Sequence, residues 1–581
     1  MIEEIKNNII AIVRDAGVTG DIVLTQPPKP EMGDFAFACF GIGKEKGVNP
    51  MVAAQELAAQ LDSCLSKDGN VVIVINEVQA FGPYVNFFVN PRELARVVLK
   101  AVTEDAKFGT HMIGQGQTVL VEYACPNPMK VFHLGHLRNL ITGEAVARLL
   151  ENAGYTVKRV NYQGDVGMHI AKSLWGIYHL LDEFEEARSK TVEEKVTFLG
   201  TAYALGATKF EEDEKIQAEI LDYNRKVYED DSDIRDVYQT ARSWSLKYFD
   251  TIYTKLGTHF DRLYFESEVF DEGKKLVLDG LAKGIFKKSD GAVIFPGSEI
   301  GLHDRVFINS QGFPTYEAKD MGLGKLHFSE YSPDKVIHVV GKEQSEYFNV
   351  VFKALAALLP QTEGKEFHLV GGYLQLKGDQ KMSSRKGKVI SGDELIAIVE
   401  EQVKEIMVER DLVDKTTKEN IVHNVANAAL KYALLRVNVS QDMAFDVHES
   451  ISTSGDSGPY VLYIVTRIRS LLAKAGISSD GTQLHQEITI PTEVSFEEKN
   501  LLLLLGRFFE VTEQAARELD PSVITKYVFA VAQAFNVFYQ TCPVLDAPEI
   551  QKQFRLHLIT IVSRIMKQSL DILAIETVSE M

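Results

Sequence analysis

The spacing of apolar residues changes several times along the chain and separates regions of different fold. Residues 1–92 begin with two helical patterns around a turn rich in glycine and proline, and end with the strand patterns VVIVINEV and YVNFFVN. From residue 116 strand and helix patterns alternate, which indicates a parallel sheet. Residues 171–250 interrupt the alternation with charged helical patterns, and after about Asp393 the chain is almost entirely helical.

These patterns predict a multidomain α/β protein with a Rossmann-like parallel-sheet domain at its centre. In chain order the predicted regions are a small α+β domain (1–92), a connector (93–115), the parallel-sheet domain (116–395) with a helical insertion at about 171–250, a helical region (396–450) and an all-α domain (451–581). An open parallel sheet binds ligands at the carboxyl ends of its strands, so we expect the chemistry there.

Two histidines stand where a predicted strand gives way to a predicted helix. The strand pattern QTVLVEYA (117–124) leads into PNPMKVFHLGHLRN, and apolar residues then recur at helical spacing. Free backbone N–H groups and the helix dipole make such a turn a phosphate site. His133 and His136 can face the same way, and Gly135 lets a ligand approach the backbone. The alternative is a helix cap beside an ordinary surface histidine.

A second loop follows the late strand pattern GGYLQL. It reads KGDQKMSSRKGKVISGDEL (377–395) and contains lysines and serine hydroxyls that could neutralise a triphosphate. Its candidate residues are Lys381, Met382, Ser383, Ser384 and Lys386. The alternative is an exposed basic loop without a ligand.

Charge and composition exclude several classes of protein. The formal net charge of −19 argues against a protein that coats nucleic acid indiscriminately, although it does not exclude RNA binding by local patches. No apolar run approaches the roughly 20 residues that span a bilayer, and the acidic N-terminal pattern is unlike a leader peptide. The four cysteines form no CxxC pair, so neither a zinc knuckle nor a disulfide framework is indicated. We expect a cytoplasmic protein without membrane contact.

HLGH and KMSS, in this order and on these elements, resemble the HIGH and KMSKS signatures of class I aminoacyl-tRNA synthetases. The longer segment VEYACPNPMKVFHLGHLRN is close to the extended signature of the arginyl-tRNA synthetase family. Further segments resemble that family's later blocks over nearly the whole chain: NYQGDVGMH (161–169), TYEAKDMG (315–322), VVGKEQSEYF (339–348), NAALKYALLRVNVSQDMAFD (427–446) and SGPYVLYIVTRIRSLL (457–472).

The resemblance implies an arginine–tRNA ligase. ATP would activate L-arginine to arginyl-adenylate with release of pyrophosphate, and the arginyl group would pass to the 3′ end of tRNA(Arg). Mg²⁺ would arrive with ATP, and neither a tightly bound cofactor nor a metal site of the protein's own is implied. The family resemblance also implies a monomer and a need for tRNA before adenylate forms. It makes the region 396–450 a stem-contact region and 451–581 an anticodon-binding domain.

The arginine pocket is assigned by matching positions. A guanidinium has five donors in one plane and keeps its charge, so it needs carboxylates and a planar neighbour. The family's guanidinium-binding tyrosine and aspartate match Tyr316 and Asp320, and Glu266 matches an additional acidic contact. Asn127 and Gln344 match positions that hold the substrate's α-amino and carboxylate groups. Glu122, an acid on an apolar strand, either serves the pocket or orients Tyr316.

The chain departs from the class I pattern at Ser384, where KMSK would have lysine. Lys130, just before HLGH, is then the candidate cation for the α-phosphate, with Lys381 and Lys386 acting from the loop.

Two regions carry candidate tRNA contacts. FGPYVNFF resembles the segment that touches the outer corner of tRNA, where Tyr84 could stack on a base and Asn86 could hydrogen-bond to it. Residues 451–581 contain 11 Lys/Arg and 15 Asp/Glu, a net of −4, so recognition there needs a few specific side chains. The candidates are Arg467, Arg469, Tyr460, Tyr463, Phe535 and Tyr539, of which we expect one or two aromatic rings to be exposed and the others to belong to the core.

Two other functions stay open on the sequence. One is another class I synthetase or a small nucleotidylyltransferase with similar loops, although the long helical C-terminus argues against the small transferases. The other is a catalytically silent tRNA-binding relative. The presence of His133, His136, Lys381 and Asp320 argues against a silent protein.

Overall fold

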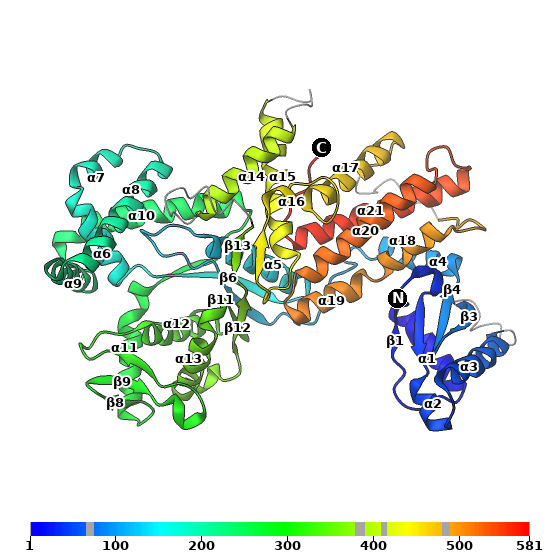
Figure 1. Cartoon of the computed structure of the whole chain (residues 1–581), viewed down its shortest axis with the longest axis horizontal. Helices are drawn as coiled ribbons and strands as arrows, with labels where there is room; N and C mark the ends of the chain where they lie inside the picture. The colour runs from blue at the N-terminus through cyan, green and yellow to red at the C-terminus, as the bar shows by residue number, and fades with distance from the viewer. Residues whose placement is uncertain (1, 66–74, 378–389, 408–414, 479–487, 580–581) are drawn as a thin grey trace.

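The computed structural model describes residues 2–65, 75–377, 390–407, 415–478 and 488–579. Figure 1 shows an elongated arrangement, with the N-terminal domain and a helical insertion at opposite ends and a parallel sheet between them. Among the described residues, no helix has both the length and the apolar composition that a bilayer crossing requires.

The N-terminal domain is an antiparallel sheet covered by helices. Its strands are β1 (Leu24–Thr25), β2 (Phe35–Ala38), β3 (Ile75–Phe81) and β4 (Tyr84–Val89), in the order β1-β2-β4-β3. The helices are α1 (Ile2–Asp15), α2 (Phe40–Lys46) and α3 (Pro50–Leu65), with a short 3₁₀ turn, η1 (Pro30–Met32). The first helix buries one apolar face, formed by Ile2, Ile5, Ile9 and Val13, which explains the helical pattern of the first residues.

The central sheet has five parallel strands in the order β12-β11-β5-β6-β7. They are β5 (Thr118–Glu122), β6 (Thr156–Gln163), β7 (Arg262–Phe265), β11 (Lys335–Gly341) and β12 (Glu366–Gly371). The chain runs outward in one direction from β5 to β7 and in the other from β11 to β12. The carboxyl ends of β5 and β11 therefore form the switch point at which doubly wound sheets bind ligands. This confirms the predicted Rossmann-like sheet.

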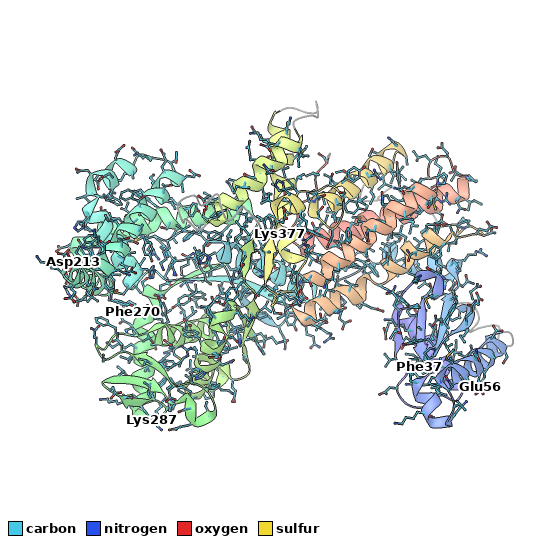
Figure 2. The ribbon with its side chains drawn as sticks, in the orientation of Figure 1. Phe37, Glu56, Asp213, Phe270, Lys287 and Lys377 are labelled. Atoms are coloured by element: carbon cyan, nitrogen blue, oxygen red, sulfur yellow. The ribbon has the colours of Figure 1, made fainter. Side chains whose placement is uncertain are left out.

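A helical insertion separates β6 from β7. It consists of α6 (Met168–His179), α7 (Leu181–Ala187), α8 (Val192–Glu212), α9 (Glu214–Tyr228) and α10 (Ser232–Lys255). These helices have a core of their own, in which Ile170, Phe184, Leu199 and Trp244 are buried together. Asp213, between α8 and α9, lies at the far end of the molecule in Figure 2.

Two strand patterns lie outside the parallel sheet. VIF and RVFI belong to β9 (Ala292–Phe295) and β10 (Arg305–Ile308), which form a small antiparallel sheet with β8 (Lys287–Ser289). The reason is the Asp290-Gly291 turn, in which both residues have positive φ. Asp-Gly favours a tight hairpin, and a hairpin can join only antiparallel strands. In the chain this sheet lies between α11 (Glu266–Ala282) and α12 (Tyr316–Tyr331), which pack against each other, and β10 contacts both helices.

The strand before the basic loop also leaves the main sheet. Residues of GGYLQL form β13 (Leu374–Leu376), which pairs in parallel with β14 (Met443–Phe445) from the helical region. Lys377, the last described residue before the loop, lies near the centre of the molecule in Figure 2.

The C-terminal part is helical, as predicted. Its helices are α14 (Gly392–Met407), α15 (Lys415–Leu435), α16 (Val447–Ser450), α17 (Gly458–Lys474), α18 (Phe496–Gly506), α19 (Phe508–Glu518), α20 (Ser522–Thr541) and α21 (Glu549–Ile572). Helices α18 and α21 pack against α4 (Pro91–Glu104), the helix that follows the N-terminal domain. The N-terminal domain is also tied to these helices directly, through ion pairs from Lys6 to Glu510 (2.7 Å) and from Lys499 to Asp34 (2.6 Å).

The helix after β5 is the centre of the molecule's packing. This helix, α5 (Leu134–Asn152), contacts β5, β6 and β11 as well as α14, α15, α19 and α21. It lies so close to the end of β5 that a Cβ atom on Gly143 would overlap the ring of Tyr123. Glu144, the next residue, accepts a hydrogen bond from the Tyr123 hydroxyl (2.8 Å).

We expect Gly143→Ala to destabilise the protein by about 1–3 kcal/mol, because the new methyl group overpacks α5 against Tyr123. The matched control is Gly200→Ala in α8, where a Cβ would meet no atom within 4 Å. That change should stabilise its helix by roughly 0.5–1 kcal/mol. Urea or thermal unfolding of the full chain measures both. Equal effects of the two substitutions would contradict the close packing of α5 on β5.

Candidate active site

A cavity of about 640 Å³ opens at the switch point between β5 and β11. Its walls come from the carboxyl ends of these strands, the start of α5, α12 and the helix after β11, which is α13 (Ser345–Leu358). Nine of the residues predicted for the site line this cavity: Glu122, Asn127, His133, Gly135, His136, Glu266, Tyr316, Asp320 and Gln344.

The two histidines form the start of α5. His133 is the N-cap residue, and its Nδ1 accepts a hydrogen bond from the backbone N–H of His136 (3.3 Å). The His136 Nδ1 accepts from the N–H of His133 in return (3.3 Å), and the rings stack with centroids 3.6 Å apart. Since each Nδ1 accepts, each neutral ring carries its proton on Nε2. The site therefore contains two N–H donors on stacked rings at a helix N-terminus. The two histidines form the capping box of α5 and also line the cavity.

The surroundings keep both imidazoles neutral. Burial lowers the pKa of His133 and lowers that of His136 further, and the charge of Lys130 acts in the same direction. Gly135 suits the same geometry, because a Cβ there would lie only 3.0 Å from the ring of His133 and would crowd it. A neutral donor can approach a phosphate without first losing a counter-ion.

The segment after the basic loop returns to these histidines. Ser391 forms an antiparallel bridge with His133, and the Gly392 N–H donates to the carbonyl of Phe132 (2.7 Å). Lys381, Met382, Ser383, Ser384 and Lys386 lie outside the described residues. The end of the loop segment is nevertheless fixed beside HLGH.

The opposite part of the cavity is acidic. Asp320, one turn along α12 from Tyr316, accepts a hydrogen bond from the Tyr347 hydroxyl (2.5 Å). Burial raises the pKa of Asp320 to about 8, with the charge of Glu122 acting in the same direction and the Tyr347 hydroxyl opposing it. A half-buried carboxyl group in this state is suited to a cation, which would restore its ionised form.

Glu266 is already paired within the protein. It begins α11, is buried, and lies 2.6 Å from the Nζ atom of Lys319. Lys319 in turn lies over the rings of Tyr316 (5.1 Å) and Tyr228 (5.6 Å). Glu266 therefore lines the cavity, where it was predicted as an additional acidic contact, and its charge is compensated by Lys319 in this structure.

Glu122 contacts histidines. Its Oε1 lies 3.0 Å from Nδ1 of His338, and its Oε2 lies 3.8 Å from Nε2 of His327. The structure thus pairs Glu122 with His338 on the neighbouring strand and not with Tyr316, so the alternative in which it orients Tyr316 has no support. Burial raises the pKa of Glu122, but the opposing charge of His338 leaves it below its ordinary value.

The remaining cavity residues are positioned by backbone contacts, and Lys130 lies elsewhere. The Asn127 side chain accepts from the N–H of Gly164 (3.0 Å), and Gln344 accepts from the N–H of Gly341 (3.2 Å). The Nζ atom of Lys130 lies over the ring of Tyr203 in α8 at 5.4 Å. Lys130 is absent from the cavity lining, so its predicted contact with a phosphate would require its side chain to turn.

The N-terminal tRNA candidates differ in accessibility. Tyr84 is 37% exposed and makes an edge contact with the exposed Phe40, so a base could reach this pair of rings. Asn86 is only 2% exposed, and its amide donates to the carbonyl of Met32 (2.8 Å). The expectation for Asn86 is therefore wrong in this structure, because its side chain fastens the turn before β2 and does not face solvent.

In α17 one of the two predicted arginines lies among aromatic rings. Arg467 lies over Tyr463 (4.6 Å) and over the exposed Tyr539 (5.1 Å). Arg469 instead donates to Thr577 (2.7 Å) and to the carbonyl of Val578. It therefore holds the C-terminal segment in place, and its predicted role in tRNA binding is corrected to a structural one.

The other predicted rings are more covered. Phe535 is fully buried, and Tyr460 is half-buried with its edge against Phe529. Phe535 is thus the one of the four rings that belongs to the core, Tyr460 and Tyr463 are half-buried against it, and Tyr539 is exposed, within the one or two exposed rings that were expected.

Sequence reasoning missed His338, Tyr347 and Glu366, which line the cavity, and Lys319, which is paired with the lining residue Glu266. His338 is polar within the apolar strand pattern KVIHVVG, the same signal that singled out Glu122, and it could have been found in this way. Lys319 and Tyr347 gave no such signal, because charged and tyrosine residues are common on helices. Only the packing of α12 against α11 and α13 brings them to the site.

Comparison with protein families agrees with this geometry. Residues 97–447, more than half of the chain, match the family described as tRNA synthetases class I (R), catalytic domain. Residues 1–89 match the arginyl tRNA synthetase N terminal domain, and residues 461–581 match the DALR anticodon binding domain.

Individual relatives match along their whole length. The arginine–tRNA ligase of Treponema denticola is 32% identical over 94% of this chain and 93% of its own length. The arginine–tRNA ligase of Clostridium perfringens is 31% identical over 96% of this chain and 95% of its own length. The solved structure of the Thermus thermophilus arginyl-tRNA synthetase has a TM-score of 0.76 at 25% identity and covers 100% of both chains. By its family match and by these full-length relatives, the chain belongs to the arginyl-tRNA synthetase family of class I tRNA synthetases.

Proposed function

We propose that this protein joins L-arginine to tRNA(Arg) in two steps at the cavity between β5 and β11. In the first step the arginine carboxylate attacks the α-phosphate of ATP, so that arginyl-adenylate forms and pyrophosphate leaves. In the second step a hydroxyl of the terminal adenosine of tRNA attacks the arginyl carbonyl, and AMP leaves. One observation carries the proposal. The same cavity is lined by two N–H donors at a helix N-terminus and by the Asp320 carboxyl group, whose raised pKa favours a bound cation.

The nucleotide half of the site is the start of α5. The Nε2–H groups of His133 and His136 would donate to phosphate oxygens as charge develops on them during transfer. Gly135 keeps the backbone accessible to the nucleotide. Mg²⁺ would enter as part of the ATP substrate, and the lysines of the basic loop would add positive charge. Neither step needs a covalent enzyme intermediate, so catalysis rests on positioning and on charge stabilisation.

The amino-acid half of the site is the acidic end of the cavity. Asp320 would bind the guanidinium beside the ring of Tyr316, with Glu122 and the paired Glu266 contributing negative potential. Asn127 and Gln344 would hold the α-amino and carboxylate groups, which places the reacting carboxylate between the acids and the histidines. The tRNA would need to be present before adenylate forms.

The tRNA would lie along the elongated face that joins the two ends of the molecule. In this proposal the domain at 1–92 meets its outer corner through Tyr84, the helices of 396–450 meet its stem, and 451–581 read the anticodon. The acidic total charge favours recognition by a few specific side chains. We place the enzyme in the cytoplasm and expect it to be a monomer. Analytical ultracentrifugation would test the oligomeric state.

A single assay separates this proposal from its rivals. ATP–pyrophosphate exchange is measured with each of the twenty amino acids in the presence of transcribed tRNA(Arg), followed by aminoacylation with the amino acid that responds. Arginine alone should respond. Exchange with another amino acid would point to a different synthetase, and no exchange with any of them would point to a silent tRNA-binding protein.

His136→Ala should lower the arginylation rate by roughly 10²-fold or more, the usual cost of losing one transition-state donor. The KM for arginine should change little, because the acidic end of the cavity is untouched. Steady-state aminoacylation measures both quantities. The control is His179→Ala on α6, whose ring hydrogen-bonds to the backbone carbonyl of Trp175 and stacks on the Trp175 ring, away from the cavity lining. A turnover number near that of the control would contradict the phosphate role.

Arginine use should depend on pH through Asp320. Because the pKa of this carboxyl group is raised to about 8, the ionised form that binds a guanidinium dominates only above that pH. The kcat/KM for arginine in pyrophosphate exchange should therefore rise up to about pH 8 and then level off, while the KM for ATP shows no such step.

Asp320→Asn should remove the rise of kcat/KM with pH. It should also lower kcat/KM for arginine by the equivalent of about 2–4 kcal/mol in activation free energy, the cost of breaking a buried charged hydrogen bond. Asp271→Asn, at an exposed position of α11, is the control. Intact arginine kinetics in Asp320→Asn, together with weakened ATP use, would mean that the arginine pocket is placed wrongly.

Arg467→Ala should lower kcat/KM for tRNA by about 5- to 150-fold, the range expected for one lost stacking contact of 1–3 kcal/mol. The KM for arginine should stay the same. Lys474→Ala, an exposed cation near the end of the same helix, controls for loss of charge alone. Equal effects of the two substitutions would show that α17 attracts tRNA only through its charge.

A further inference from the structure

Three titratable side chains form a continuous chain along the wall of the cavity. His338 on β11 lies directly opposite Glu122 on β5. On the other side His338 is opposite His368 of β12, and Glu366 lies two residues before His368. The Nδ1 atom of His338 is 3.0 Å from Glu122, and its Nε2 atom is 2.8 Å from Glu366. All three side chains are buried, and all three residues line the cavity.

This geometry favours the doubly protonated, charged form of His338. A carboxylate can only accept, so a ring that meets a carboxylate oxygen at both nitrogens must donate from both. Only the imidazolium carries two N–H groups. The neighbouring charges of Glu122 and Glu366 agree, because they raise the pKa of His338 well above its ordinary value although burial opposes them.

The other groups around His338 do not replace its charge. His327 on α12 lies 6.3 Å away between ring centroids, and burial lowers its pKa to about 4, so it is neutral. Phe348 and Phe352 on α13 face the ring at 5.2 and 5.4 Å and do not titrate. His368 on β12 also has a lowered pKa, because burial and the charge of His338 both act against its protonation.

The charges of Glu122 and His338 also affect the pKa of Asp320. Glu122 raises the pKa of Asp320 and His338 lowers it, so the imidazolium partly offsets the repulsion between two carboxyl groups that share one buried site. Without a cation beside Glu122, two such groups tend to keep a proton between them. A cavity in that state has lost part of its attraction for a guanidinium.

We propose that His338 is a positioning residue for arginine: held between Glu122 and Glu366, it fixes the Glu122 carboxylate in its charged form and makes Asp320 easier to ionise when the guanidinium enters. It acts through these two acids. This inference rests on the proposed placement of arginine in the cavity. Glu366 has a supporting role, because it holds the second nitrogen of the ring and so the ring's orientation.

The decisive variant is His338→Gln, in which the side-chain amide can still donate to Glu122 but carries no charge. At pH 7 the KM for arginine should rise by about 10- to 100-fold, with a much smaller change in kcat. The midpoint of the pH profile of kcat/KM should move upward from its wild-type position by about one pH unit. The difference from the wild type should therefore shrink toward pH 9.5, where both acids ionise without help.

Two further variants complete the series. Glu366→Gln leaves the contact between His338 and Glu122 in place, so it should shift the profile in the same direction by a smaller amount. His111→Gln is the control for loss of a buried imidazole, because His111 is also buried and bonds to Thr512 (2.9 Å), away from the cavity lining. It should leave the pH profile unchanged. Thermal unfolding of each variant shows whether it folds.

A rise in arginine KM that is equal at every pH would overturn the proposal, since it would reveal a purely structural role for His338. An unchanged KM would overturn it as well. If His338→Gln does not fold, Glu366→Gln decides alone, and an unmoved pH profile in that variant rejects the proposal. Failure of the arginine assignment itself looks different, because Asp320→Asn would then leave arginine kinetics intact.

Discussion

The reversal of strand order between β5 and β11 is the constraint on which the rest of the site depends. Two parallel strands that send the chain in opposite directions leave their carboxyl ends side by side, and the helices that follow them move apart. The cavity of about 640 Å³ occupies this place. HLGH begins the helix after β5, and the acids stand on β5 and α12. One topological feature therefore brings a phosphate-binding helix end within the same cavity as a cation-binding pocket.

Electrostatics divides this cavity into two halves of opposite chemistry. At the start of α5 burial keeps the imidazoles of His133 and His136 neutral, so they offer donors beside a positive helix end. At the other end several buried carboxyl groups lie together, which is costly unless cations compensate them. Lys319 compensates Glu266 and His338 compensates Glu122, whereas Asp320 has only a hydroxyl partner among its described contacts. The carboxyl groups at this end, which include Glu366 on the other side of His338, thus outnumber the two cations that compensate them, and a guanidinium would supply further positive charge.

The position of α5 also connects the cavity to distant parts of the chain. It begins at the histidines, packs closely against Tyr123 at Gly143 and contacts α19 and α21 of the helical C-terminal region. Near its end Arg148 donates to the carbonyl of Asp571 at 2.9 Å. The helices that match the anticodon binding domain are therefore in direct contact with the helix that carries the HLGH motif. A change in their packing has a short physical route to the active site.

The sequence by itself determined the features that depend on local pattern. Alternating strand and helix periods predicted the parallel sheet, and the apolar spacing after HLGH predicted α5, because both follow from backbone geometry and from burial of one face. Nine of the predicted site residues also reached the cavity, since they lie on motifs at strand and helix ends. Local chemistry also accounts for the Asp290-Gly291 hairpin, because both residues have the positive φ that a tight turn requires.

Tertiary structure decided which partner each charged group has. No spacing in the sequence shows that Lys319 compensates Glu266, that His338 lies between Glu122 and Glu366, or that Arg469 holds the C-terminal segment. Asn86 looked like a surface contact and is buried, because strand alternation gives two faces and does not say which one the rest of the domain covers. Pairing and burial are relations between segments far apart in the chain, and only the packed fold brings those segments together.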